Sequence, residues 1–190
     1  MKRKIFVISL FVMMLAIISA GSYAYFTAEY TAHNVITSGT IDIKLEEWAV
    51  NPDPTGEELI PFEDVIGVMP GAVVSKIAAV RNIGTADAWI RAEVTVTLTR
   101  SDGTTEEIDP AFITLDYNTE DWTLIDGLWY CKTAPAPNDV TEPLFTTVTF
   151  DADMDNRYQN STVAIDVLVQ ATQKIHNGVT VEEAKGWPKD

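Results

Sequence analysis

The sequence contains a single cysteine, Cys131, so no disulfide can form within the chain. Without disulfides the fold must be held together by a hydrophobic core, and 190 residues are enough to build one. Cys131 lies in an apolar, strand-like run, and free cysteines are among the most frequently buried residues. We expect Cys131 to be a small buried side chain; a bridge between chains or a nucleophile is the alternative.

Histidine is also scarce, and the two histidines, His33 and His176, are far apart in the sequence. The chain has no His-Glu-x-x-His helix of the zincin type and no Gly-x-Ser-x-Gly elbow of a serine hydrolase. It also lacks the Gly-x-Gly spacing of a dinucleotide-binding loop. We therefore expect no catalytic residues, no enzymatic activity and no organic cofactor.

Basic residues are few compared with acidic ones. The 13 Lys and Arg residues stand against 28 Asp and Glu, which gives a net charge of −15. Nucleic acids and anionic membrane surfaces repel such a chain. We expect no nucleic-acid partner, and an acidic surface that mainly keeps the protein soluble.

The N-terminus carries a long apolar run, in which three basic residues precede an apolar stretch over residues 5–20. Ser22 and Ala24 then form the small-x-small pattern of a signal-peptidase site, with cleavage before Tyr25. We interpret residues 1–24 as a cleaved signal peptide. A permanent membrane anchor is the alternative, but the stretch is short for a span of about 20 residues. Cleavage removes three positive charges and leaves 10 basic against 28 acidic residues, a net charge of −18.

Alternation of apolar and polar residues is the main structural signal. From Ala88 to Thr99 the even-numbered positions are all apolar, whereas the odd-numbered positions are mostly polar. This pattern predicts a strand with one face in the core and the other face, including Trp89, in water. Thr162 to Thr172 repeats the pattern less cleanly.

Further strands are expected where short apolar or alternating runs lie between turn residues, namely at residues 40–46, 73–82, 113–117, 122–125, 128–133 and 144–150. Asp126-Gly127 fits a two-residue hairpin turn, because both positions of a type I′ turn require a positive φ. Asn51–Asp64 is rich in proline and acidic residues, and we expect it to form an exposed excursion.

Many short strands with regular turns predict an all-β fold, an antiparallel jelly-roll β-sandwich over residues 39–190. Helix is expected in two places. One is the signal peptide, and the other is a short helix near the C-terminus, where Thr180 and Glu183 form a capping box.

One acidic run, Asp151, Asp153 and Asp155, has carboxylates at alternate positions, as at the start of a calcium-binding loop. The run departs from the EF-hand pattern, because Asn156 stands where glycine is needed and Thr162 where a glutamate is needed. A solvated loop between two strands is the simpler interpretation, and weak calcium binding is the alternative.

Three blocks of the sequence resemble one family. The first runs from Gly21 to Leu45 and includes Ser-Gly-Thr-Ile-Asp-Ile at residues 38–43. The second combines Met-Pro-Gly at residues 69–71 with Arg-Asn-Ile-Gly-Thr-Ala at residues 81–86. The third is the last expected strand, up to Gln173. In order and spacing these blocks resemble the TasA/camelysin (CalY) family of Gram-positive bacteria, although the centre of the chain matches only loosely.

The resemblance implies a secreted subunit of biofilm matrix fibres, with a leader processed by the dedicated signal peptidase SipW. In such fibres the N-terminal segment of one subunit, here residues 25–38, completes the sheet of the next. Phe26, Ala28, Tyr30 and Ala32 fall on one side of an alternating stretch and suit such a donor strand. Head-to-tail addition does not close, so it produces filaments. The alternative is that the strand packs in its own subunit.

Two other functions stay open. Camelysin is described as a cell-surface metalloprotease, although the sequence shows no zinc ligand set. A β-sandwich can also bind calcium or glycans through its loops, and Trp48, Trp122 and Trp129 could stack on sugar rings if they are exposed. As a fibre subunit, the protein would assemble with itself or a sister protein, in the extracellular matrix or at the cell surface.

Overall fold

The computed structural model describes residues 26–29, 32–34, 41–63, 66–68, 70–100, 103–107, 112–154, 158 and 161–188. The predicted signal peptide with Ser22, Ala24 and Tyr25 lies outside the described residues, as do Tyr30 and Asp155. Within the described ranges, no helix has the length and hydropathy that a membrane span requires.

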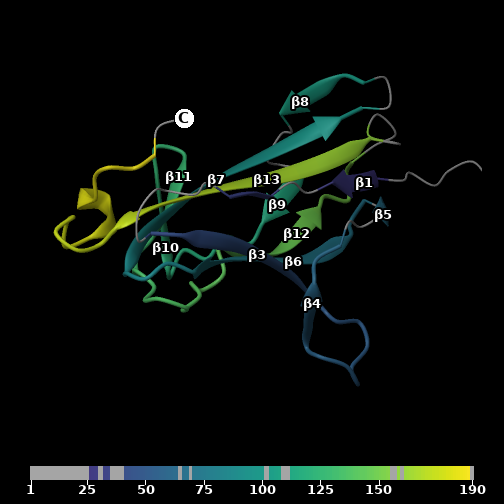
Figure 1. Cartoon of the computed structure of the whole chain (residues 1–190). Helices are drawn as coiled ribbons and strands as arrows, with labels where there is room; N and C mark the ends of the chain where they lie inside the picture. Colours follow the sequence, from purple (N-terminus) through teal and green to yellow (C-terminus); the bar gives the residue numbers. More distant parts are fainter. Residues whose placement is uncertain are drawn as a thin grey trace, which may run out of the picture.

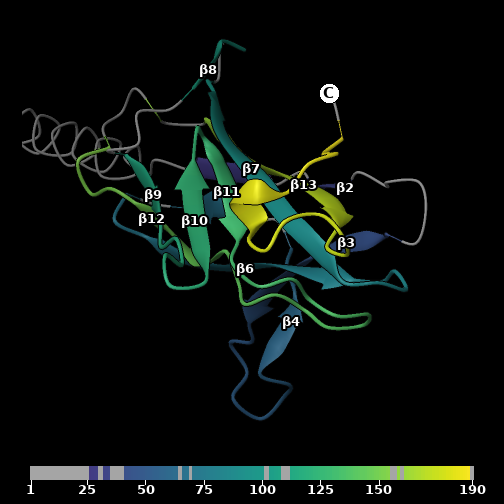
Figure 2. The same cartoon turned by 90° about the vertical axis from the view of Figure 1, so that its left-hand side faces the viewer.

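The described strands form two sheets (Figures 1 and 2). The first sheet has the order β10 (Trp122–Ile125), β11 (Leu128–Cys131), β7 (Ala88–Thr99), β13 (Thr162–Gln173), β1 (Phe26–Glu29) and β5 (Ile66–Val68), with β2 (Ala32–Asn34) also on β13 and β8 (Thr105–Glu107) on β7. The second sheet has the order β4 (Leu59–Pro61), β3 (Ile43–Val50), β6 (Val73–Asn82), β12 (Phe145–Phe150) and β9 (Ile113–Leu115).

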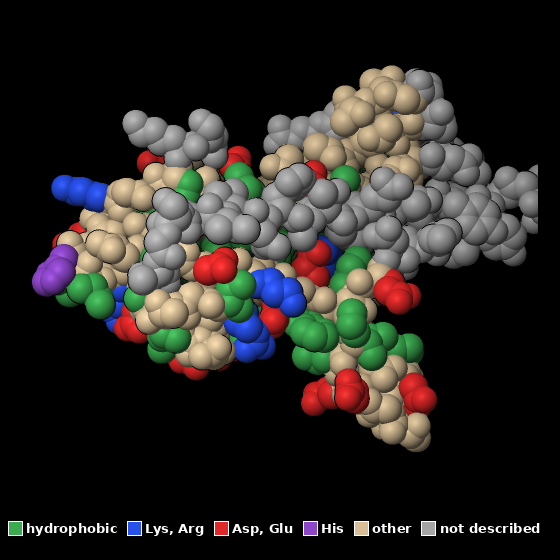
Figure 3. Space-filling view, viewed as in Figure 1, with side chains coloured by type: hydrophobic (Ala, Val, Ile, Leu, Met, Phe, Trp, Pro, Cys, Tyr) green, Lys and Arg blue, Asp and Glu red, His purple; other side chains and the backbone are tan. Residues whose placement is uncertain are grey.

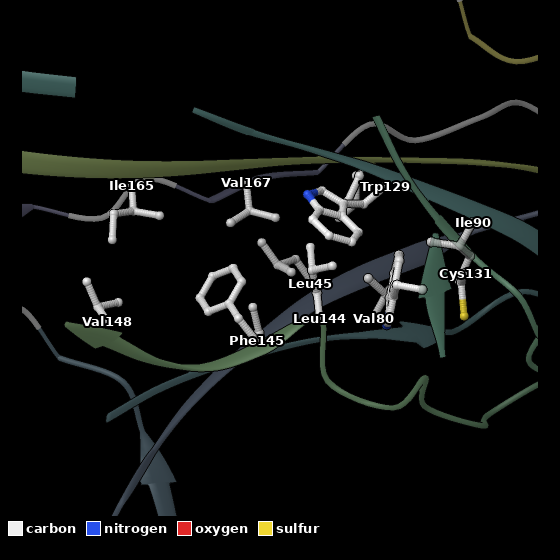
Figure 4. Packing of buried hydrophobic residues seen from close by; sticks show 14 of the residues in the cluster. Leu45, Val80, Ile90, Trp129, Cys131, Leu144, Phe145, Val148, Ile165 and Val167 are labelled. Carbon is white, nitrogen blue, oxygen red and sulfur yellow. The ribbon is translucent and has the colours of Figure 1, made fainter. Parts of the chain in front are cut away.

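The core lies between the two sheets, because alternate residues of each strand point inward. Figure 4 shows Ile165 and Val167 of β13 pointing toward Phe145 and Val148 of β12. All four side chains are at most 1% exposed. The even-numbered residues of β7 also line the core, as their alternation predicts. The prediction of an all-β sandwich is confirmed.

Several local predictions are confirmed as well. Strands β6, β7 and β10 have the predicted bounds. Asp126 and Gly127 have φ values of 50° and 83°, and they join β10 to β11 as the predicted two-residue turn. The excursion after β3 is an exposed arm that projects from the sandwich (Figure 1), although it also contains the short edge strand β4.

Two predictions about the chain ends are corrected by the structure. The C-terminal helix is a single 3₁₀ turn, η2 (Val181–Glu183), and the Thr180 side chain makes no capping hydrogen bond. Instead, the Glu183 carboxylate accepts a hydrogen bond from the backbone N–H of Val179 at 2.9 Å. The sheet is also not wholly antiparallel, because β1 and β2 run parallel to β13. No turn joins these strands to β13, so nothing in the connection requires them to be antiparallel.

Candidate assembly interface

The N-terminal strands lie along β13 in a single register. Thr27 pairs with Thr162 and Ala32 pairs with Val167, so the partners in both pairs are 135 residues apart. Because the offset is the same, β1 and β2 follow one line along the edge of β13. They can be treated as one interrupted N-terminal strand.

This N-terminal strand occupies a slot inside the first sheet. β1 pairs with β13 on one side and with β5 on the other, and its register with β5 shifts between Phe26 and Thr27. The opposite edge of β13 is paired with β7 from Thr162 to Gln173. Without β1 and β2, the N–H and C=O groups along the free edge of β13 would need other partners. The slot is therefore a binding site for an extended strand.

The predicted apolar face of the N-terminal strand is in register with the core-facing residues of β13. Ala28 pairs with Val163, and Ala32 pairs with Val167. Val163 and Val167 are 0% and 1% exposed. In this backbone register, Ala28 and Ala32 stand opposite two core-facing residues of β13. The donor-strand role of these residues stays a prediction.

Residues 174–188, which we call the C-terminal clasp, return over one end of the first sheet. The Asn177 amide nitrogen donates to the carbonyls of Gln173 at 2.9 Å and Lys185 at 2.8 Å, and the amide oxygen accepts from the Lys185 N–H at 2.8 Å. Gly178 has a φ of 86°, and a Cβ there would lie 2.9 Å from a neighbouring side-chain carbon. The Asn-Gly pair therefore fixes the turn in the first part of the clasp.

The clasp covers Trp89, which the alternation of β7 places on the water-facing side. Trp89 is only 3% exposed, because Val181 and Ala184 of the clasp pack against it. Trp187 lies over β7 as well, with the Arg91 guanidinium 4.8 Å from its ring centre. The spacing of Val181, Ala184 and Trp187 after the last strand is the signal that could have revealed this cover.

A hollow of about 390 Å³ lies where the clasp meets the end of β13. Its walls include Ile41, Ala171, Gln173, His176 and Lys185. The pairing between β2 and β13 ends at Asn34 and Val169, so the hollow begins two residues further along β13. The hollow therefore lies along β13 just beyond the end of the slot that the N-terminal strand occupies.

Cys131 and two of the tryptophans are buried. Cys131 is 0% exposed, and burial raises the pKa of its thiol, so the prediction of a buried side chain is confirmed. Trp122 and Trp129 are 1% and 7% exposed, so they are core residues and cannot stack on a glycan. Trp48 is partly exposed.

The fold and the slot define a β-sandwich protein whose N-terminal strand completes a sheet. The sequence model of the family described as Camelysin metallo-endopeptidase matches residues 1–117, more than half of the chain, and the chain belongs to this family. The resemblance drawn from the sequence is confirmed. The matched part includes β1, β2 and both halves of the second block. No curated protein matches the chain significantly.

The family description implies a metal, but the described residues do not fit a zinc site. No three His, Cys, Asp or Glu side chains that could share a metal ion come together in the part of the chain that the structure describes. His176 lines the hollow beside Lys185, whose positive charge opposes a bound cation. In the acidic run, the Asp151 carboxylate accepts the N–H of Asp153 at 2.7 Å, and Asp155 lies outside the described residues. Weak calcium binding by this run stays a prediction.

Proposed function

We propose that this protein is a secreted structural subunit of extracellular biofilm matrix fibres, in which the N-terminal strand of one copy completes the sheet of the next. The observation that carries the proposal is the single register of β1 and β2 along β13. Thr162 lies 135 residues after Thr27 and no turn joins the two strands, so the same pairs can form between two copies. Exchange of an identical element between copies is a low-cost route to assembly.

The position of the strand at the start of the chain supports this exchange. Cleavage before Tyr25 would place the new N-terminus one residue before β1. A free end can leave one slot and enter another without threading a loop. In this proposal Phe26 and Tyr30 anchor the donated strand, and a dedicated signal peptidase releases it. The strand enters a further copy or a sister fibre protein.

The family description favours a second candidate, a cell-surface metalloprotease. The described residues that could supply ligands do not form a zinc set. We therefore place this activity second and derive no catalytic step. Casein hydrolysis by the purified protein that is abolished by a chelator would favour the protease over the fibre subunit.

The exchange can be tested by cross-linking two copies through their register. One chain carries Thr27→Cys and a second, differently tagged chain carries Thr162→Cys, both starting at Tyr25. Partners in a β-ladder have Cα atoms about 5 Å apart, which suits a disulfide. After mixing, assembly and mild oxidation, we expect a mixed disulfide of unique size on a non-reducing gel. Cys131 does not interfere, because it is buried.

In the matched control, the first chain carries Glu29→Cys in place of Thr27→Cys, and the second chain still carries Thr162→Cys. Glu29 pairs with Ala164, two residues out of register with Thr162, a shift of about 7 Å along the strand. We expect the mixed disulfide to be much weaker with this control. No mixed disulfide, or equal disulfides at both positions, would contradict strand exchange.

A further inference from the structure

We propose that β5 is a latch, a strand that joins the first sheet only when an N-terminal strand lies in the slot and that closes over this strand as it binds. The inference rests on the proposed strand exchange only for the source of the strand, which is the same chain or a second copy. It adds how the slot opens and closes.

The pairing of β5 depends on a single neighbour. β5 lies at the margin of the first sheet beside β1 (Figure 1), and among the described strands only β1 pairs with it. The pairs are Phe26 with Val68 and Thr27 with Ile66. Because β1 belongs to the strand that the proposed exchange moves, β5 loses its ladder partner whenever this strand leaves the slot.

The chain on both sides of β5 is held by the second sheet. Before β5, the Phe62 N–H donates to the Glu47 carbonyl at 3.0 Å. After β5, the Gly71 N–H donates to the Phe150 carbonyl at 3.0 Å. Glu47 belongs to β3 and Phe150 to β12, both in the second sheet. β5 is therefore a short excursion from the second sheet to the first, anchored at both of its ends.

A strand of three residues is not stable without a partner. Its N–H and C=O groups lose their ladder hydrogen bonds, and these bonds no longer offset the conformational entropy lost when the backbone is fixed. β13, in contrast, keeps β7 as its partner from Thr162 to Gln173. The slot therefore has one fixed wall and one wall that forms with the bound strand, so a strand can enter from the side of β5 without threading.

Hydrogen exchange measured by mass spectrometry tests the latch in the chain starting at Tyr25. Ala28→Pro removes a backbone N–H from β1 and weakens its docking on β13, whereas the two residues that pair with β5 are unchanged. We expect the amides of Ile66–Val68 to exchange about tenfold faster or more, while β6 and β12 keep their protection. The matched control is Thr105→Pro in β8, another three-residue strand of the first sheet, and it should leave exchange in β5 unchanged.

A second variant acts in the opposite direction. Thr27→Cys with Thr162→Cys in the same chain holds the strand in the slot when the pair is oxidised, so exchange in β5 should then be slower than after reduction. Three results would each overturn the latch. They are unchanged exchange in β5 of the Ala28→Pro variant, equal acceleration in the Thr105→Pro control, and no difference between the oxidised and reduced forms of the double-cysteine variant.

A synthetic peptide of residues 25–34 separates the latch from strand exchange. When the peptide is added to the Ala28→Pro variant, it should restore slow exchange in β5, which supports both proposals. If β5 exchanges faster in this variant and the peptide does not slow it, the latch stands and strand exchange is contradicted. If exchange in β5 never changes, the latch fails, and the mixed disulfide alone decides strand exchange.

Discussion

At the residue scale, single polar side chains hold the loops at the ends of the sandwich. Asn82 is 0% exposed, and its amide nitrogen donates to the carbonyls of Ala86 at 2.8 Å and Pro135 at 2.9 Å. Its amide oxygen accepts the Gly84 N–H at 3.0 Å. A buried amide with all these partners ties two loops together. This gives a structural reason for the Asn-x-Gly pattern in the second resemblance block.

Asp116 has a similar role between β9 and β12. Its carboxylate accepts hydrogen bonds from the backbone N–H groups of Thr146 at 2.8 Å and Thr147 at 2.7 Å, and from the Thr146 hydroxyl. Partial burial raises the pKa of Asp116, but these hydrogen bonds outweigh burial and lower the pKa below its ordinary value of 3.8. The ionised form is thus the one that stabilises the fold.

We predict that this stabilisation depends on pH. A carboxyl group with a lowered folded pKa contributes stability above its unfolded pKa, and the contribution is lost as the pH falls through the folded pKa. Asp116→Asn should therefore lower the free energy of unfolding at pH 7 by about 1 kcal/mol, a modest amount because the carboxylate is only partly buried and water screens it. The difference from wild type should shrink below about pH 4. Urea unfolding at several pH values measures it, and a difference independent of pH would contradict the assignment.

At the element scale, the long strands could be predicted from the sequence because each has its own alternation. β7 and β13 each contain a full set of inward-facing apolar residues, so their local pattern matches their environment. The three-residue strands β4, β5 and β8 were not predicted, because so few residues have no readable period. Trp89 was assigned to the wrong environment, because the clasp that buries it starts 85 residues further along the chain, at Lys174.

We predict that Asn177 holds the clasp in place. Asn177→Ala removes the hydrogen bonds to Gln173 and Lys185 and should lower the free energy of unfolding by about 2 kcal/mol. Trp89 lies under the clasp and Trp187 lies within it, so both should become more exposed to water when the clasp loosens. Tryptophan emission should therefore shift to longer wavelength, whereas the β-sheet circular dichroism should stay unchanged.

A matched control for this prediction is Asn51→Ala. The Asn51 side chain also closes a turn, by accepting the Asp53 N–H at 2.9 Å, but it lies in the arm between β3 and β4. The tryptophan emission spectrum of the Asn51→Ala variant should stay close to that of the wild type. An unshifted spectrum for Asn177→Ala, or equal shifts in both variants, would show that Asn177 does not hold the clasp.

At the scale of the whole molecule, acidity would oppose the proposed assembly. Acidic side chains are spread over the face shown in Figure 3, and none of the 28 acidic residues of the chain lies in the predicted leader. The chain from Tyr25 onward has 10 basic and 28 acidic residues, a net charge of −18, so copies of it repel each other, and this repulsion is long-ranged at low ionic strength.

We predict that assembly accelerates with salt. Raising the salt concentration from about 10 mM to about 150 mM shortens the screening length from about 30 Å to about 8 Å, so the approach of two copies becomes easier. Light scattering of the chain starting at Tyr25 should show a shorter lag at the higher salt concentration. A lag that lengthens with salt would indicate that attraction between opposite charges drives assembly instead.

The sequence by itself determined the family, the all-β class and the faces of the long strands, because these depend on residue order and on alternation along short stretches. Alternation also marked the N-terminal strand, with Ala28 and Ala32 on its apolar side. Only the tertiary structure decided that this strand runs parallel to β13 in one register and that a hollow lies at the end of its slot. The physical reason is that pairing between residues 135 positions apart leaves no trace in the local pattern of either strand.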